Sequence, residues 1–167
     1  MNKKFRGKYR TESIRLKGWD YGSNATYFIT ICTKNRKHYF GEIINKKMHL
    51  SQIGMVAVSC WEDIRNHFPF VRLVVMPNHV HGIIIVEKNE KPKQASENKF
   101  GPQSKNLGSI MRGFKVGVKK YATLNKLDFE WQPRYYESII RNGRSYYKVT
   151  NYIKSNPSSW KEDNFYN

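Results

Sequence analysis

Two histidines separated by one residue, His79 and His81, are the side chains in this sequence best suited to binding a metal. They follow the turn signal Pro77-Asn78 and begin an apolar run that ends at Val86. Side chains alternate between the faces of a β-strand, so both imidazoles point the same way. A structural zinc site is normally closed by four ligands, so two histidines indicate an open, catalytic metal site. The alternative is a pair of half-exposed polar side chains without a ligand.

A second group of candidate residues lies on a predicted helix over residues 107–125. Tyr121 and Asn125 are one helical turn apart, a spacing at which side chains are neighbours. They continue an apolar stripe formed by Leu107, Ile110, Met111, Phe114 and Val118. An aromatic residue in such a stripe ordinarily packs in the core, which is the alternative for Tyr121. Another face of the helix carries the cations Arg112, Lys115, Lys119 and Lys126.

Three glycines lie beside these candidate residues. Gly82 follows the histidines and has no side chain to block a molecule that approaches their face. Gly113 and Gly117 are one turn apart on the predicted helix, and each costs about 1 kcal/mol relative to alanine. Such a cost indicates either close approach to another backbone or a helix that shifts, and the sequence leaves both open.

The elements that must position these residues form an alternation of strands and helices. Apolar and β-branched runs predict strands at 27–33, 70–75 and 80–86, a hairpin over 40–50, and a strand ending near residue 141. Helical periodicity predicts helices over 51–68, capped by Ser51, over 107–125 and over 145–155. The run from Val80 to Val86 is apolar on both faces, which is typical of a central strand covered by helices. The order β, ββ, α, ββ, α, β, α predicts an antiparallel α+β sandwich.

The chain of 167 residues is long enough for one domain with a substantial core. It carries 30 Lys and Arg against 13 Asp and Glu, a net charge of +17 that points first to nucleic acid and second to an anionic membrane surface. No apolar run reaches the length of a membrane-spanning helix. Cys32 and Cys60 lie in apolar segments without paired spacing, which predicts reduced core residues in a cytoplasmic protein.

Three segments differ from this globular pattern. Residues 1–17 form a basic arm, either solvated or in contact with phosphates through residues such as Arg10 and Arg15. Residues 88–106 are polar and predict a mobile loop. Residues 130–167 form a C-terminal extension of the single domain.

Several motifs together resemble one protein family. Met76-Pro-Asn-His79-Val-His81 is similar to the signature of the HUH endonuclease superfamily, and Lys119-Lys-Tyr121-Ala-Thr-Leu-Asn125 is similar to the nucleophile helix of its single-tyrosine transposases. Four further blocks resemble one IS200-like branch, the REP-associated tyrosine transposases: residues 13–21, residues 27–36, Trp131-Gln-Pro-Arg-Tyr-Tyr-Glu-Ser-Ile-Ile-Arg141 and Tyr152-Ile-Lys-Ser-Asn156-Pro157. The resemblance covers almost all of the chain, from about residue 13 to residue 157.

The resemblance implies a ferredoxin-like fold and an enzyme that cuts and rejoins single-stranded DNA carrying hairpins of repetitive extragenic palindromes. It implies that His79 and His81 hold a divalent metal, Mg²⁺ or Mn²⁺, that Asn125 occupies the position of a third ligand, and that Tyr121 is the nucleophile. A phenol with a pKa near 10 needs a cation to become an effective nucleophile, and its attack on DNA gives a 5′-phosphotyrosine. The expected DNA contacts are the cations Arg10, Arg15, Arg112, Lys115, Lys119, Lys120, Lys126 and Arg134.

Two other functions compete with the transposase interpretation. One is a domesticated protein that binds single-stranded DNA or an RNA hairpin without chemistry, and the other is a metal-dependent hydrolase in which water attacks. Tyr135, Tyr136, Tyr146 and Tyr147 could also replace Tyr121 as the nucleophile. The family resemblance implies a monomer, with a homodimer as the alternative, in the cytoplasm and associated with the nucleoid.

Overall fold

The computed structural model describes residues 4–5, 8–9, 18–21, 23–68, 72–87 and 106–167. Its centre is a four-stranded antiparallel sheet with the strand order β6-β7-β3-β8. The strands of this sheet are β3 (Ala25–Cys32), β6 (Arg72–Met76), β7 (His79–Val86) and β8 (Tyr136–Ile140). Two separate pairs are β1 (Lys4–Phe5) with β2 (Lys8–Tyr9) and β4 (Gly41–Ile44) with β5 (Lys47–Leu50).

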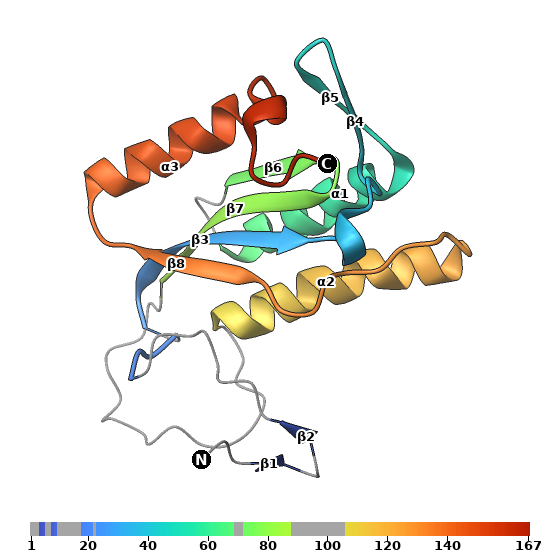
Figure 1. Cartoon of the computed structure of the whole chain (residues 1–167). Helices are drawn as coiled ribbons and strands as arrows, with labels where there is room; N and C mark the ends of the chain where they lie inside the picture. The colour runs from blue at the N-terminus through green and yellow to red at the C-terminus, as the bar shows by residue number, and fades with distance from the viewer. Residues whose placement is uncertain (1–3, 6–7, 10–17, 22, 69–71, 88–105) are drawn as a thin grey trace.

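Three α-helices cover the two faces of the sheet: α1 (Gln52–His67), α2 (Leu107–Leu124) and α3 (Gly143–Ser155). Figure 1 shows α1 and α2 on one face and α3 on the other, above β6 and β7. Short 3₁₀ turns follow β3 at Lys34–Arg36 and α3 at Trp160–Glu162. This arrangement is an α+β, ferredoxin-like fold, as the family resemblance implies.

The main hydrophobic core lies between the sheet and the pair α1 and α2. Alternate side chains of β3 and β7, including Ile29 and Val80, point to this face and are fully buried with Ala57 of α1 and Phe114 of α2. Gly82 also faces this layer, because a Cβ added there would lie 2.4 Å from the ring of Trp61. Gly82 therefore gives space to α1, which corrects the prediction that it leaves the histidine face open.

Polar side chains fix where each helix begins. Ser51 caps α1 as predicted, accepting a hydrogen bond from the backbone N–H of Gly54 at 3.1 Å. Asn106 and Ser109 form a reciprocal capping box at the start of α2. Asn142 accepts from the backbone N–H of Ser145, so α3 starts two residues earlier than the periodicity predicts.

The opposite face of the sheet carries α3 and the segment that follows it. Trp160 from this segment packs against His79 with ring centroids 6.0 Å apart, and Phe165 packs closer, at 4.5 Å. β7 is a central strand, as its apolar run predicts, and β6 forms an edge of the sheet. The predicted mobile loop, up to residue 105, and most of the basic arm lie outside the described residues. Within the described part of the chain, no helix is both long and apolar enough to cross a membrane.

Candidate active site

His79 and His81 lie side by side on β7, on the sheet face that carries α3. Their Nε2 atoms are 2.9 Å apart, and their side chains are buried, with 0% and 1% of the residue surface exposed. The strand alternation that points Val80 into the main core turns both imidazoles the other way. The structure thus brings the two histidines together as the His-x-His spacing predicts, but more deeply buried than an open site.

Each imidazole is fixed through its other nitrogen. His79 Nδ1 lies 2.8 Å from the side-chain oxygen of Asn78, and His81 Nδ1 lies 2.8 Å from Thr30 Oγ1 on the neighbouring strand. Asn78 is itself held, because its Nδ2 donates to the backbone oxygen of Phe165 at 2.8 Å. An amide oxygen accepts a hydrogen bond, so the His79 hydrogen is on Nδ1 and its Nε2 carries a lone pair. Such partners orient histidine ligands in metal sites.

Asp163 completes a cluster of three metal-binding side chains. One ligand atom each from His79, His81 and Asp163 lies within 4.8 Å of the others. The carboxylate is oriented by the backbone N–H of Phe165, which donates to Oδ1 at 2.7 Å, and by Asn156 Nδ2, which donates to Oδ2 at 2.5 Å. Two nitrogens and one carboxylate, turned toward one point in a buried site, fit a divalent cation.

The histidine pair is held in the neutral form that metal binding requires. Burial lowers the pKa of His79 to about 2, with further lowering by His81 and Arg36. Burial lowers the pKa of His81 to about 4, against an opposing contribution from the Asp163 carboxylate. At neutral pH neither imidazole is protonated, so both can donate a lone pair.

Tyr152, on α3, lies at this cluster. Its hydroxyl is 3.2 Å from His81 Nε2 and donates a hydrogen bond to Asp163 Oδ2 at 3.3 Å. The ring packs on His81, with centroids 5.1 Å apart. Burial and the Asp163 carboxylate raise the pKa of Tyr152 to about 12, so the phenol is protonated in this arrangement. The structure therefore places one tyrosine oxygen beside the candidate metal ligands.

The predicted nucleophile, Tyr121, lies elsewhere. It belongs to α2, which packs on the other face of the sheet, and its hydroxyl accepts a hydrogen bond from Gln52 Nε2 of α1 at 2.8 Å. Asn125 is exposed, and its side-chain nitrogen donates to the backbone oxygen of Tyr121 at 2.9 Å. Within one chain the sheet separates both residues from the histidines, because α2 packs on the face of the sheet opposite to α3.

The predicted DNA contacts on α2 also lie away from Tyr152. Lys115 donates to the backbone oxygens of Gln132 and Arg134, and Lys119 donates to that of Phe129, so these two lysines hold the segment before β8. The side chains of Arg112, Lys120, Lys126 and Arg134 are exposed. Arg10 and Arg15 lie outside the described residues.

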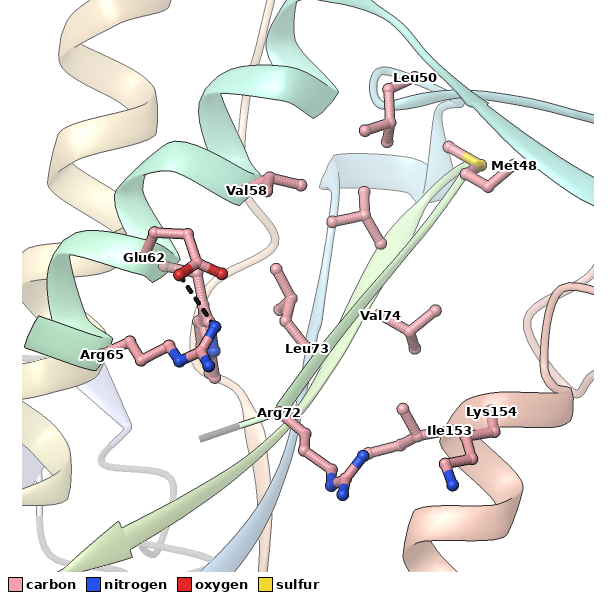
Figure 2. Close-up of a pocket in the computed structure, with 12 residues that line it drawn as sticks. Met48, Leu50, Val58, Glu62, Arg65, Arg72, Leu73, Val74, Ile153 and Lys154 are labelled. Carbon is pink, nitrogen blue, oxygen red and sulfur yellow. Dashed lines mark hydrogen bonds and ion pairs between the residues drawn. The ribbon is translucent and has the colours of Figure 1, made fainter. Parts of the chain in front are cut away.

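A groove of about 480 Å³ borders the other flank of α3, along the free edge of β6. Figure 2 shows Arg72 and Lys154 on the side of β6 that faces α3, whereas Glu62 and Arg65 form an ion pair at 3.3 Å on the α1 side. Among the residues that the structure describes, neither Arg72 nor Lys154 forms an ion pair. Both cations are therefore available to a phosphate.

The prediction from sequence missed Tyr152, Asn156 and Asp163. A signal for the first two was present, because Tyr152 and Asn156 are one helical turn apart, the spacing that singled out Tyr121 and Asn125. Asp163 had no local signal, since it lies on an irregular segment beyond α3 and reaches the histidines only through the tertiary fold.

Comparisons with known proteins identify relatives of the chain. No family model matches the chain. The chain is 43% identical to an uncharacterized protein of Haemophilus influenzae over 96% of this chain and 95% of that protein. It is 25% identical, over 83% of this chain and 73% of the other, to a candidate REP-associated tyrosine transposase of the same organism.

A solved structure shows the same fold. It is a REP-associated tyrosine transposase bound to a REP hairpin, and it superimposes with a TM-score of 0.57 and 21% identity over 92% of this chain and 73% of that chain. The chain belongs to one family with the uncharacterized protein of Haemophilus influenzae, and it is similar to REP-associated tyrosine transposases.

Proposed function

We propose that this protein is a metal-dependent endonuclease and strand transferase that acts on single-stranded DNA with hairpins of repetitive extragenic palindromes. The observation that carries the proposal is the Tyr152 hydroxyl, 3.2 Å from His81 Nε2 in a cluster of two histidines and an aspartate. The relation to tyrosine transposases supports the reaction class, and the relative bound to a REP hairpin supports the choice of DNA.

His79, His81 and Asp163 would hold a divalent cation, Mg²⁺ or Mn²⁺. Such a cation polarises the P–O bonds of a phosphodiester and stabilises the charge that develops during displacement. The two histidines are neutral ligands for this cation, because burial holds both of their pKa values well below 7. They also fix ligand orientation through Asn78 and Thr30.

In the reaction we propose, the Tyr152 oxygen gives up its proton to Asp163 and attacks phosphorus, the bond to the 3′ oxygen breaks, and the leaving 3′ oxygen takes up a proton, which gives a 5′-phosphotyrosine and a 3′-hydroxyl. Asp163 Oδ2 holds the phenol proton and aims the oxygen, while Asn156 steadies the carboxylate. The raised pKa keeps Tyr152 protonated when Asp163 is its main electrostatic neighbour, so the nucleophile becomes reactive only when positive charge enters the site.

The cover over the histidines favours tyrosine over water as the nucleophile. Phe165 packs on His79 at 4.5 Å and on His81 at 5.8 Å, and Arg36 lies over the Phe165 ring. This packing limits the access of water to the histidine nitrogens, whereas Tyr152 is 41% exposed and can meet a phosphate that approaches from solvent.

The experiment that tests this function compares two tyrosines. Labelled hairpin oligonucleotides are incubated with Mg²⁺ or Mn²⁺ and the parent protein, Tyr152→Phe or Tyr121→Phe, and the products are separated on a denaturing gel. We expect a covalent adduct with the parent and with Tyr121→Phe, and none with Tyr152→Phe.

Three results would contradict the proposal in different ways. An adduct with Tyr152→Phe but not with Tyr121→Phe would return the role to Tyr121. Cut DNA without any adduct would identify a hydrolase. Hairpin binding by the parent without cutting would identify a binding protein that has lost its chemistry.

A further inference from the structure

We propose that Tyr136 is a stacking platform for the nucleobase next to the phosphate that Tyr152 attacks. The inference deepens the proposed function and rests on it. It assigns a nucleobase-binding site to the part of the sheet that α3 leaves uncovered, formed by β3 and β8.

The first argument is the position of Tyr136 relative to the site. Tyr136 pairs with Thr30 across β8 and β3, and Thr30 pairs with His81 across β3 and β7. Directly paired residues point to the same face of an antiparallel sheet. Tyr136 therefore shares the face of His81 and lies two strands away from it.

The second argument is a chain of ring contacts. The Phe28 ring stacks on His81 at 5.3 Å, meets Tyr152 edge-on at 6.2 Å and meets Tyr136 edge-on at 6.5 Å. Phe28 is thus a shared neighbour that fixes the position of Tyr136 relative to the attacking oxygen. A base on Tyr136 would extend this aromatic row away from the candidate metal ligands.

The third argument is exposure. Tyr136 shows 56% of its surface although it stands on the face that carries the site. An exposed aromatic ring beside a site for single-stranded DNA fits a base, because every base has a face that stacks on such a ring.

Cations on α3 can contact the phosphates of the DNA strand whose base stacks on Tyr136. Lys148 and Arg144 precede Tyr152 by one and two helical turns, and both are exposed on the flank of α3 that carries Tyr152. A strand whose base stacks on Tyr136 can place the following phosphates along these side chains.

The test uses Tyr152→Phe protein, which we expect to bind DNA without cutting it. Hairpin oligonucleotides with a single-stranded 5′ tail carry one 2-aminopurine, a fluorescent base that stacking quenches, at successive tail positions. We expect binding to quench one position. The double variant Tyr152→Phe with Tyr136→Ala should lose that quenching and bind the oligonucleotide about tenfold more weakly, in the range that one stacked base contributes.

Two matched changes separate stacking from other roles. Tyr136→Phe keeps the ring and should keep both quenching and affinity. Tyr147→Ala removes a tyrosine that is 67% exposed on the outer side of α3, and it should leave the quenching intact. Circular dichroism confirms that each variant is folded.

The failure of this inference can be told apart from the failure of the proposed function. If Tyr136→Ala retains the quenching while the parent forms a Tyr152 adduct, the stacking role is wrong and the enzyme remains. If the parent protein binds none of the oligonucleotides, both proposals are wrong.

Discussion

At the scale of single residues, the site depends on which imidazole nitrogen faces the ligands. The Nδ1 atoms of His79 and His81 are occupied by Asn78 and Thr30, so both Nε2 atoms meet 2.9 Å apart. The two Nε2 atoms lie within hydrogen-bonding distance of one another, and a divalent cation bound between them would replace that contact. The side chains around the imidazoles therefore determine metal affinity as much as the imidazoles do.

Replacing Thr30 by Val should weaken metal binding with little effect on the sheet. Valine keeps the β-branched shape but loses the oxygen that holds His81, and loss of such a partner typically costs 10- to 100-fold in metal affinity, so we expect about that loss. Calorimetric titration with Mn²⁺ measures it. Thr26→Val, on the same face of β3, is the control and should bind Mn²⁺ like the parent.

The metal-free protein should lose stability in acid because of the two histidines. In the unfolded chain each takes up a proton near its ordinary pKa of 6.5, whereas in the folded chain the pKa values are about 2 and about 4. Above pH 6.5 the two histidines do not lower the free energy of unfolding. As the pH drops from 6.5 toward 4, each histidine lowers the free energy of unfolding by about 1.4 kcal/mol per pH unit. Below pH 4 the slope halves, since His81 then becomes protonated in the folded state too.

Urea unfolding in EDTA between pH 7 and pH 4 measures this loss. His81→Gln should show a shallower pH dependence than the parent, and His49→Gln, which changes an exposed histidine, should not. Equal slopes for the parent and His81→Gln would show that His81 does not stay neutral in the fold.

At the scale of elements, α2 and α3 show what the sequence could predict. Each carries a tyrosine and an asparagine one turn apart, Tyr121 with Asn125 and Tyr152 with Asn156. Local periodicity predicts both helices and their apolar sides, because the spacing of apolar residues shows which side of a helix is buried. It does not report which face of the sheet a helix covers, and only the tertiary arrangement assigns Tyr152 to the histidine face.

The two glycines of α2 have different surroundings, which answers a question that the sequence leaves open. A Cβ at Gly117 would lie 3.0 Å from the Cys60 sulfur of α1, whereas a Cβ at Gly113 meets nothing within 4 Å among the described residues. Gly117 thus permits close approach of α1 to α2, and Gly113 carries the helix penalty without a packing reason.

Alanine substitution should therefore have different effects at these two positions. Gly113→Ala should raise the free energy of unfolding by about 1 kcal/mol, the difference in helix propensity. Gly117→Ala should gain less or destabilise the protein, because the Cys60 side chain must move. Urea unfolding of both variants measures the difference, and an equal gain at both positions would contradict the packing argument.

At the scale of the whole molecule, the sheet separates stability from chemistry. One face buries the core with α1 and α2, and the other carries the histidines, Tyr152 and the uncovered strip around Tyr136. The net charge of +17 applies to the whole chain, and the groove along β6 adds Arg72 and Lys154 to the candidate phosphate contacts.

DNA binding should depend strongly on salt. For single strands the slope of log affinity against log salt is about −0.7 for each phosphate contact. The double change Arg72→Ala with Lys154→Ala should make the slope shallower by about 1.4, since two contacts are lost. Arg65→Ala, which removes a cation already paired with Glu62, should change it less. Fluorescence anisotropy at several salt concentrations gives the slopes, and a flat parent response would contradict phosphate contact.

The order of the site residues along the chain has a consequence for synthesis on the ribosome. Thr30 precedes His81 by 51 residues, Tyr152 follows His81 by 71, and Asp163 comes later still. Translation adds about 5–20 residues per second, so the histidine strand exists for several seconds before the proposed nucleophile is made. On the proposed function, a nascent chain made only as far as β7 holds both histidines but neither the attacking oxygen nor Asp163, so the capacity to cut DNA arises only after α3 and the segment beyond it have been made.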